Sequence, residues 1–177
     1  VLSGAEGTIT VGGADYKYHV VCTAKLPTVY ITTESGSMDA VHADKSHKEA
    51  GTIKIYNAKG KTEYDGDLDY IKGRGNSSWE MAKKPYNIKI AKKTNLFGMG
   101  KSKKWSLIAN YSDNSQLRNA AVYYAAQQIG LDYTPKFVFC DVYTNGDYQG
   151  VYLLITRIEA DSKRVDVANL DDVNEEI

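Results

Sequence analysis

A glycine-rich segment over residues 72–79 (KGRGNSSW) contains the side chains best suited to bind an anion. Gly73 and Gly75 permit a tight turn and a close approach of the backbone to a ligand. Between them, Arg74 offers a guanidinium fork that fits phosphate oxygens. Asn76 and the two serines after it add short donors and backbone amides of the kind found in anion nests. The segment matches neither the P-loop nor the dinucleotide GxGxxG pattern, so its spacing alone also fits an ordinary loop with an exposed arginine.

A dense run of lysines follows this segment. From Met81 to Lys104 the sequence contains eight lysines and no acidic residue, although the whole chain is balanced at 22 basic and 22 acidic residues. Lys84 and Lys89 lie just before and within a predicted strand over residues 86–90, and a lysine on a rigid strand beside a glycine-containing loop can bind nucleotide phosphates. The alternative is that Lys89 belongs only to the solvent face of an edge strand. The charge pattern fits a phosphate-bearing partner and a solvated lysine-rich face equally well.

Arg118 is the remaining basic candidate. It lies in the first turns of a predicted helix over residues 115–128, where backbone amides favour an anion and a cation opposes the helix dipole. A cation at this unfavourable place indicates that Arg118 faces the same site. Nucleophilic catalysis has little support, because there is no GxSxG motif. Metal binding has little support either, because the three histidines lack metal-ligand spacing and Cys22 and Cys140 cannot form a four-ligand zinc site. The sequence assigns no catalytic residue and no metal ligand.

The elements that position these residues are mostly strands. Alternating or β-branched segments predict strands over residues 8–11, 16–22, 28–32, 52–57, 68–72, 86–90, 105–109, 137–143 and 150–156. Gly12-Gly13 and Asn145-Gly146 predict tight hairpin turns. Residues 34–50 show no periodicity and are predicted to form a mobile surface loop. The 14 tyrosines favour half-buried sheet faces over sugar-stacking surfaces.

The predicted helix has a start that Asp113 or Ser115 can cap and an end at Gly130. The residues that share one of its faces at helical spacing are Leu117, Ala121, Tyr124, Ala125 and Gln128. We therefore predict an α+β fold, a mostly antiparallel sheet with one main helix packed on it. No apolar run approaches the roughly 20 residues that cross a bilayer, so we expect no membrane span.

A series of motifs along the chain resembles the CotH family, which comprises spore-coat protein kinases and their secreted bacterial relatives. The motifs lie, in order, at residues 73–79, 83–89, 96–105, 109–113, 117–119, 142–154 and 157–159. The resemblance extends from about Pro27 to Val167. Residues 1–25 fall outside it and are predicted to be a short β extension or the end of a preceding module. Residues 26–177 are predicted to be the N-terminal part of a CotH-like kinase domain.

The resemblance implies a kinase-like fold that uses ATP and magnesium, or another divalent metal, to phosphorylate Ser or Thr on extracellular or coat proteins. It also implies a bacterial protein located outside the cell or on the spore or cell surface. By fold analogy, our sheet and helix correspond to the nucleotide-binding half, with Lys89 or Lys84 on the phosphates and residues 156–159 along the adenine edge. The predicted nucleotide-binding residues are Arg74, Asn76, Lys84, Lys89, Arg118 and Glu159.

Three departures from the family pattern bear on activity. The predicted helix has no glutamate to pair with a strand lysine, and Gln127 and Gln128 are its nearest polar candidates. No HRD-like or DFG-like motif occurs, and no counterpart of the family's second half, with its catalytic and metal-binding acids, is found. We therefore expect a fragment that is inactive alone and whose partners are its C-terminal half, ATP and a protein substrate.

A second class of function remains open. The tyrosine content and the extra N-terminal segment also fit a non-catalytic extracellular binding or scaffold module associated with polysaccharide-degrading enzymes, as in a cellulosome. Nucleic-acid binding through the lysine run is not expected, because the interleaved aromatic residues of single-strand-binding modules are missing.

Overall fold

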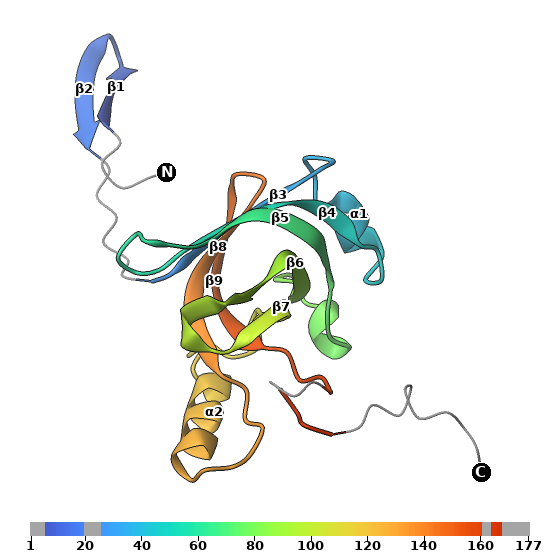
Figure 1. The fold of residues 1–177 in the computed structure, drawn as a ribbon. Helices are drawn as coiled ribbons and strands as arrows, with labels where there is room; N and C mark the ends of the chain where they lie inside the picture. The colour runs from blue at the N-terminus through green and yellow to red at the C-terminus, as the bar shows by residue number, and fades with distance from the viewer. Residues whose placement is uncertain (1–5, 20–25, 161–163, 168–177) are drawn as a thin grey trace.

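Seven strands form a closed barrel in the computed structural model, which describes residues 6–19, 26–160 and 164–167 (Figure 1). The barrel strands are β3 (Thr28–Thr33), β4 (Glu49–Tyr56), β5 (Thr62–Gly73), β6 (Tyr86–Asn95), β7 (Lys101–Ile108), β8 (Phe137–Thr144) and β9 (Asp147–Thr156). Their order around the barrel is β3-β4-β5-β6-β7-β9-β8, and neighbours are antiparallel except for β3 and β8, which pair in parallel and close it. The predicted α+β class with a mostly antiparallel sheet and one main helix is confirmed. The predicted resemblance of the fold to the nucleotide-binding half of a kinase is not confirmed.

The barrel interior is filled by alternate residues of each strand, as the period of two requires. Ile53 and Ile55 of β4 point inward with Ile88 and Ile90 of β6, and all four are fully buried. The largest fully buried side chain is Trp105 of β7. Because one face of every strand is committed to this core, the intervening residues of β6 and β7 must lie on the outside of the barrel.

A separate hairpin precedes the barrel. It consists of β1 (Glu6–Val11) and β2 (Ala14–His19), and it pairs with no barrel strand. Its turn at Gly12 and Gly13 has φ values of 61° and 83°, which suit glycine and confirm the predicted tight turn. The last residues of the strand predicted over 16–22 lie outside the described residues. The assignment of residues 1–25 to a preceding module stays a prediction.

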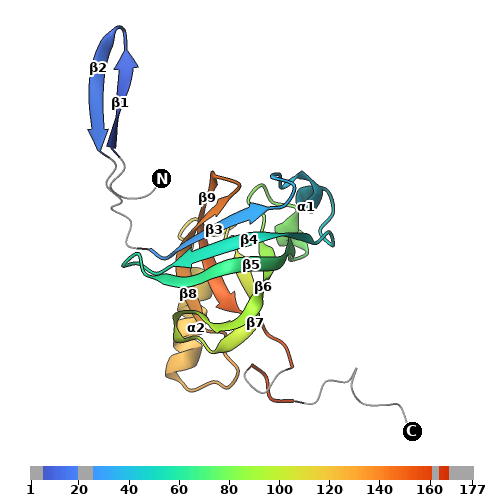
Figure 2. The same cartoon turned by 45° about the horizontal axis from the view of Figure 1, so that its top comes forward.

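The prediction of a mobile surface loop over residues 34–50 is wrong in part. The segment contains a short helix, α1 (Asp39–Ala43), and the start of β4. Val41 of α1 is fully buried and joins the barrel core. A five-residue helix is too short to leave a periodic pattern in the sequence, which explains why the pattern missed it. In Figure 2, α1 lies at one end of the strands β3, β4 and β5.

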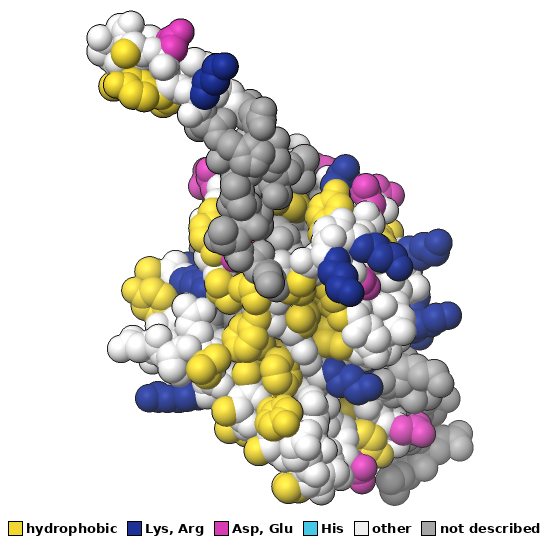
Figure 3. All heavy atoms as spheres, turned by 90° about the vertical axis from the view of Figure 1, so that its left-hand side faces the viewer, with side chains coloured by type: hydrophobic (Ala, Val, Ile, Leu, Met, Phe, Trp, Pro, Cys, Tyr) yellow, Lys and Arg dark blue, Asp and Glu magenta, His cyan; other side chains and the backbone are white. Residues whose placement is uncertain are grey.

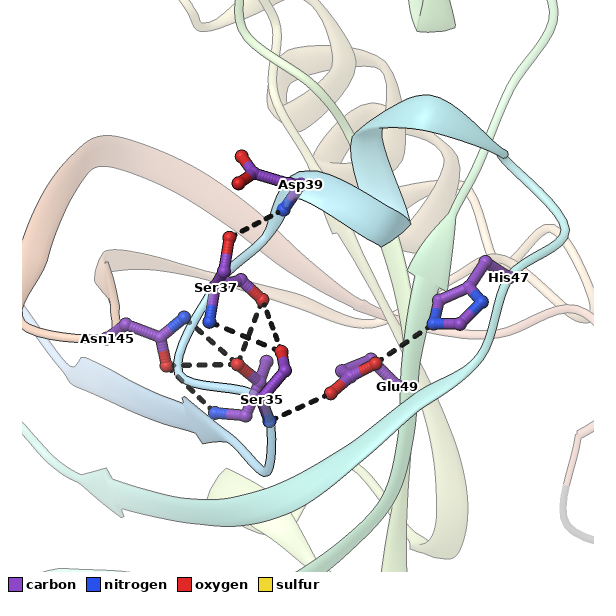
Figure 4. A network of polar contacts seen from close by, with 7 residues as sticks. Ser35, Ser37, Asp39, His47, Glu49 and Asn145 are labelled. Atoms are coloured by element: carbon purple, nitrogen blue, oxygen red, sulfur yellow. Dashed lines mark hydrogen bonds and ion pairs between the residues drawn. The ribbon is translucent and has the colours of Figure 1, made fainter.

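Polar contacts hold this segment in place (Figure 4). The side-chain oxygen of Asn145, in the β8–β9 turn, accepts a hydrogen bond of 2.9 Å from the backbone N–H of Thr33. Nearby, the backbone N–H of Ser35 donates to Oε1 of Glu49 at 3.1 Å, and Oε2 of Glu49 lies 2.9 Å from Nε2 of His47. The loop before α1 is thus tied both to the start of β4 and to a turn more than one hundred residues later.

The main helix, α2 (Arg118–Gln128), is confirmed, but it begins three residues later than predicted, and its N-cap residue is Leu117 rather than Asp113 or Ser115. Oδ2 of Asp113 accepts a hydrogen bond of 2.8 Å from the backbone N–H of Arg118, and Oγ of Ser115 accepts one of 3.2 Å from Leu117. Gly130 has a φ of 69°, the left-handed conformation expected after a helix. No helix in the described ranges is long and apolar enough to cross a membrane.

The face of α2 that packs on the barrel differs from the predicted one. Ala120 and Tyr123 contact Leu153 and Ile155, which point outward from β9, and the outward-facing Phe137 and Phe139 of β8 join them. The predicted face, which includes Tyr124, is exposed instead. Since apolar and polar residues are spread around α2 with no distinct apolar face, its sequence alone does not determine which face docks. Figure 3 shows many hydrophobic side chains left exposed on this side of the molecule.

Candidate functional site

The glycine-rich loop after β5 is built around its two glycines. A Cβ on Gly73 would lie 2.7 Å from the ring of Trp79 and 2.8 Å from Cγ of Lys45. Gly75 has a φ of +91°, and a Cβ there would lie 2.1 Å from Oγ of Ser78. Nζ of Lys45 also donates a hydrogen bond of 2.9 Å to the carbonyl of Gly75. The predicted tight turn is confirmed, and only glycine fits its two positions.

Arg74 projects from this loop into a small pocket. Its backbone N–H donates a hydrogen bond of 3.1 Å to the carbonyl of Pro85, which fixes the start of the side chain. Burial lowers the pKa of the guanidinium, Tyr123 opposes that effect, and the nearby guanidinium of Arg157 adds to it. We call this cavity of about 100 Å³ the Arg74 pocket; it is lined by Arg74, Ser78, Met81, Lys83, Pro85, Ile108, Ala109, Asn110, Tyr111, Ser112 and Asn119. Neighbouring Asn76 is exposed and does not line it.

Lys84, a predicted phosphate ligand, contacts the glycine-rich loop. Its Nζ donates a hydrogen bond of 2.7 Å to the carbonyl of Trp79 and lies 5.1 Å from the centroid of the Trp79 ring. The neighbouring Lys83 is placed similarly, with its Nζ bonded to the carbonyl of Val151 and 4.4 Å from the centroid of the Tyr152 ring. Both ammonium groups therefore have structural partners at the base of the loop.

Lys89 lies on the outside of β6, as the alternation predicted. Its Nζ is 2.8 Å from Oδ2 of Asp69, and this carboxylate raises the pKa of the ammonium group. Lys104 lies opposite Lys89 on β7, and its Nζ is 2.9 Å from Oε2 of Glu159. The two residues share a cavity of about 220 Å³, which we call the lysine pocket and which is lined by Lys89, Lys93, Ser102, Lys103, Lys104, Glu159 and Ala160.

The six predicted nucleotide-binding residues therefore do not lie in one pocket. Lys89 and Glu159 line the lysine pocket, whereas Arg74 lines a different pocket with no residue in common. The Arg118 side chain is 82% exposed at the start of α2, with its Nε 3.7 Å from Oδ1 of Asp113. The sequence pattern missed Lys93, Lys103 and Lys104 as individual candidates. The lysine run was the available signal, but only the pairing of β6 with β7 shows which lysines converge.

A third cavity flanks the segment that leaves the barrel. It measures about 280 Å³ and is lined by Met99, Gly100, Tyr133, Thr134, Lys136, Thr156, Arg157, Ile158, Arg164 and Val165. Its walls include apolar side chains beside cationic ones, unlike the lysine pocket. The predicted adenine-edge segment thus divides between two cavities, with Thr156 to Ile158 on this one and Glu159 on the lysine pocket.

The described residues do not provide a metal site. They contain no group of three or more His, Cys, Asp or Glu side chains placed to hold a metal ion. Asp69 and Glu159, the carboxylates nearest the lysine pocket, each contact a lysine. The same part of the chain provides no basis for assigning a catalytic residue.

Comparison with protein families shows to which family this chain belongs. Residues 71–175, more than half of the sequence, match the CotH kinase protein family. The chain belongs to the CotH family. The match includes all six predicted site residues and every strand from β6 to β9, whereas β3, β4 and most of β5 precede it. Comparison with curated proteins gave no match for this CotH-family chain.

Proposed function

We propose that this CotH-family chain binds the phosphates of ATP in the lysine pocket. It would form the nucleotide-binding part of a protein kinase that acts on Ser or Thr outside the cell or on the spore or cell surface. The observation that carries the proposal is the convergence of Lys89, Lys93, Lys103 and Lys104 on one cavity. The family relationship supports the use of ATP and supplies the reaction class.

The electrostatics of the lysine pocket suit a polyphosphate. Four ammonium groups line it, and two of them, those of Lys89 and Lys104, contact the carboxylates of Asp69 and Glu159. Lysine is a compact point charge that binds phosphate from many directions, so a cluster of lysines can follow a flexible triphosphate. The two ion pairs keep Lys89 and Lys104 in place before a ligand binds, which reduces the entropy lost on binding.

The base of the nucleotide would lie next to the phosphates, in the third cavity. The third cavity lies along the same segment as Glu159 and has apolar walls from Met99, Tyr133 and Ile158. Its volume of about 280 Å³ is close to the lower end, roughly 300 Å³, of cavities that enclose small ligands. A nucleotide that spans the two cavities would pass the 156–159 segment, as the family analogy predicts.

The metal and the catalytic groups are assigned to no described residue. ATP in kinases carries a divalent metal that neutralises its phosphate charge, but the carboxylates near the lysine pocket do not form a site for it. We therefore derive no step through the metal. The contribution of the described residues is to bind and orient the triphosphate, and phosphoryl transfer is proposed only for a longer protein that includes this chain.

Titration calorimetry tests the proposal. ATP is titrated, with and without magnesium, into this chain and into a longer protein that continues beyond residue 177. We expect binding to at least one of them, weakened about tenfold by Lys89→Gln or Lys104→Gln. Lys59→Gln, in the exposed turn between β4 and β5, is the matched control and should leave affinity unchanged. No binding to either protein, or binding that both pocket substitutions leave intact, would contradict the proposal.

The alternative of a polysaccharide-binding module has no such support from the structure. The rings of Tyr30 and Tyr143, on neighbouring strands, stack on each other with centroids 4.9 Å apart and an interplanar angle of 21°. Tyr86 and Tyr152 stack inside the barrel. A ring face covered by another ring is not free to stack on a sugar. Packing therefore accounts for these four tyrosines, whereas Tyr111, Tyr124 and Tyr133 are more than half exposed. We propose no second function.

A further inference from the structure

We infer that the Arg74 pocket is a binding site for a single phosphate group, separate from the nucleotide site proposed above. The ligand is a tetrahedral oxyanion, present either as free phosphate or as the phosphate ester of a small molecule or side chain. The inference rests on the charge, rigidity and size of the pocket.

The lining of the pocket is positive and has no negative charge. Arg74 and Lys83 supply two cations, Ser78, Ser112, Asn110 and Asn119 supply hydroxyl and amide donors, and no acidic side chain is among the lining residues. Burial lowers the pKa of the Arg74 guanidinium, and the positive charge of Arg157, outside the pocket lining, adds to that effect. Two like charges at a half-buried place destabilise each other unless an anion lies between or beside them. A bound phosphate would relieve this repulsion.

The donors are held in position before any ligand arrives. Nδ2 of Asn110 donates a hydrogen bond of 3.1 Å to the carbonyl of Gln116, while its Oδ1 accepts one of 2.8 Å from Nδ2 of Asn119. Each of these two amide groups therefore retains a second N–H for another acceptor. Asn110 itself has a φ of 50°, a left-handed conformation that positions its side chain over the pocket wall. The backbone of Arg74 is held by its hydrogen bond to the carbonyl of Pro85.

The size of the pocket selects a small anion. Its volume of about 100 Å³ corresponds to roughly three water molecules. Pockets that enclose drug-sized ligands begin at roughly 300 Å³, so the Arg74 pocket does not enclose a whole nucleotide. A single phosphate fits, and its oxygens match the fork of a guanidinium. Lys83 contributes its charge at longer range, because its Nζ is already bonded to the carbonyl of Val151.

The test uses inorganic phosphate and O-phosphoserine as separate probes. Each is titrated into ¹⁵N-labelled chain at constant ionic strength, with sodium chloride as the blank, and affinity is read from amide shifts. We expect shifts at Arg74, Asn110 and Asn119. Arg74→Gln should weaken binding at least about tenfold and Arg74→Lys by less, because lysine keeps the charge but loses the fork. Tighter binding of O-phosphoserine supports an esterified phosphate as the ligand, and tighter binding of the inorganic ion supports free phosphate.

Two controls separate this site from the lysine pocket. Lys89→Gln should leave phosphate affinity unchanged, and the amide spectrum of each variant reports whether it is folded. If Arg74→Gln unfolds the chain, Asn119→Asp, which adds a negative charge to the pocket, takes its place and should weaken binding as strongly. The inference is overturned if neither probe shifts the pocket amides, or if Lys89→Gln abolishes binding that the Arg74 and Asn119 variants retain. Neither result depends on whether ATP binds elsewhere.

Discussion

Lys104 on β7 and Glu159 beyond the end of β9 form an ion pair, with Nζ 2.9 Å from Oε2. The pair ties the segment that leaves the barrel to the lysine-rich β6–β7 hairpin. It also places one negative charge inside a pocket that four ammonium groups line. Glu159 thus has two opposing effects on a phosphate ligand, since it orients Lys104 but offsets its charge.

The charge effect can be isolated with inorganic tripolyphosphate, a probe that lacks the base. Glu159→Gln keeps the shape of the side chain and removes its charge, so we predict that tripolyphosphate binds about fivefold more tightly, the equivalent of about 1 kcal/mol for charges near 4 Å in water. Calorimetry measures the change. Asp15→Asn, on the separate β1–β2 hairpin, is the control for net charge alone. Weaker binding by Glu159→Gln would contradict this prediction, because it would mean that Glu159 helps binding more by orienting Lys104 than it hinders binding through its own negative charge.

The docking of α2 predicts opposite outcomes for two adjacent tyrosines. Tyr123 packs on the outer face of β8 and β9, with its ring centroid 6.0 Å from that of Phe137, whereas Tyr124 is 59% exposed. Tyr123→Ala should lower the free energy of unfolding by about 2 kcal/mol, and Tyr124→Ala should change it by less than about 0.5 kcal/mol. Urea denaturation followed by tryptophan fluorescence gives both values. Equal losses for the two variants would contradict this placement of the helix.

Gly51 is predicted to tolerate no side chain. A Cβ at this position of β4 would lie 2.1 Å from the backbone oxygen of Thr32, and backbone of the neighbouring strand cannot move aside without breaking the ladder. We expect Gly51→Ala to cost about 3 kcal/mol or more in unfolding free energy. Gly66→Ala on β5 is the control, because its Cβ would meet only the ring end of Tyr64, at 3.2 Å. A Gly51→Ala protein as stable as Gly66→Ala would refute the strand register described above.

Asp113 should make the start of α2 sensitive to acid. Hydrogen bonds from the backbone N–H of Arg118 and from the Ser115 side chain lower the pKa of this carboxyl from its ordinary value of 3.8. The unfolded chain therefore binds the proton more readily, and the stabilisation is complete above pH 3.8 and is lost as the pH falls toward the lowered pKa. Asp113→Asn should be less stable than the wild type at neutral pH, and the difference should shrink below pH 3.8.

Thermal unfolding at several pH values measures this effect. Asp132→Asn, at an exposed position beyond α2, provides the matched control and should follow the wild-type profile. A difference between Asp113→Asn and the wild type that stays constant into strong acid would mean that the carboxylate charge does not stabilise the helix.

Local patterns were sufficient to predict most strands of this fold. Segments such as 52–57 and 86–90 alternate because one face of each strand is buried, and the Asn145-Gly146 turn, with φ values of 51° and 91°, allows only a tight hairpin. Local patterns did not predict the closure of the barrel. That closure depends on the parallel pairing of β3 with β8, two segments more than one hundred residues apart, and no short-range signal specifies such a partner.

The candidate site shows the same division between local and tertiary information. The outward direction of Lys89 follows from the period of its strand and was predictable. The neighbours of Lys89 in the pocket, Lys104 and Glu159, come from two other parts of the chain, and only the order of strands around the barrel brings them together. Conversely, Arg74 and Lys84 are close to Lys89 in sequence, yet the bonds of the glycine-rich loop direct them elsewhere.

Amide-shift mapping with MgATP tests the central proposal most directly, because it reports where the nucleotide binds as well as whether it does. On ¹⁵N-labelled chain we predict that the largest shifts occur at Lys89, Ser102 to Lys104, and Glu159, with smaller ones along the third cavity. Shifts confined to the residues around Arg74 and Asn119, or no shifts in this chain or in a longer protein that contains it, would contradict the assignment of the lysine pocket as the nucleotide site.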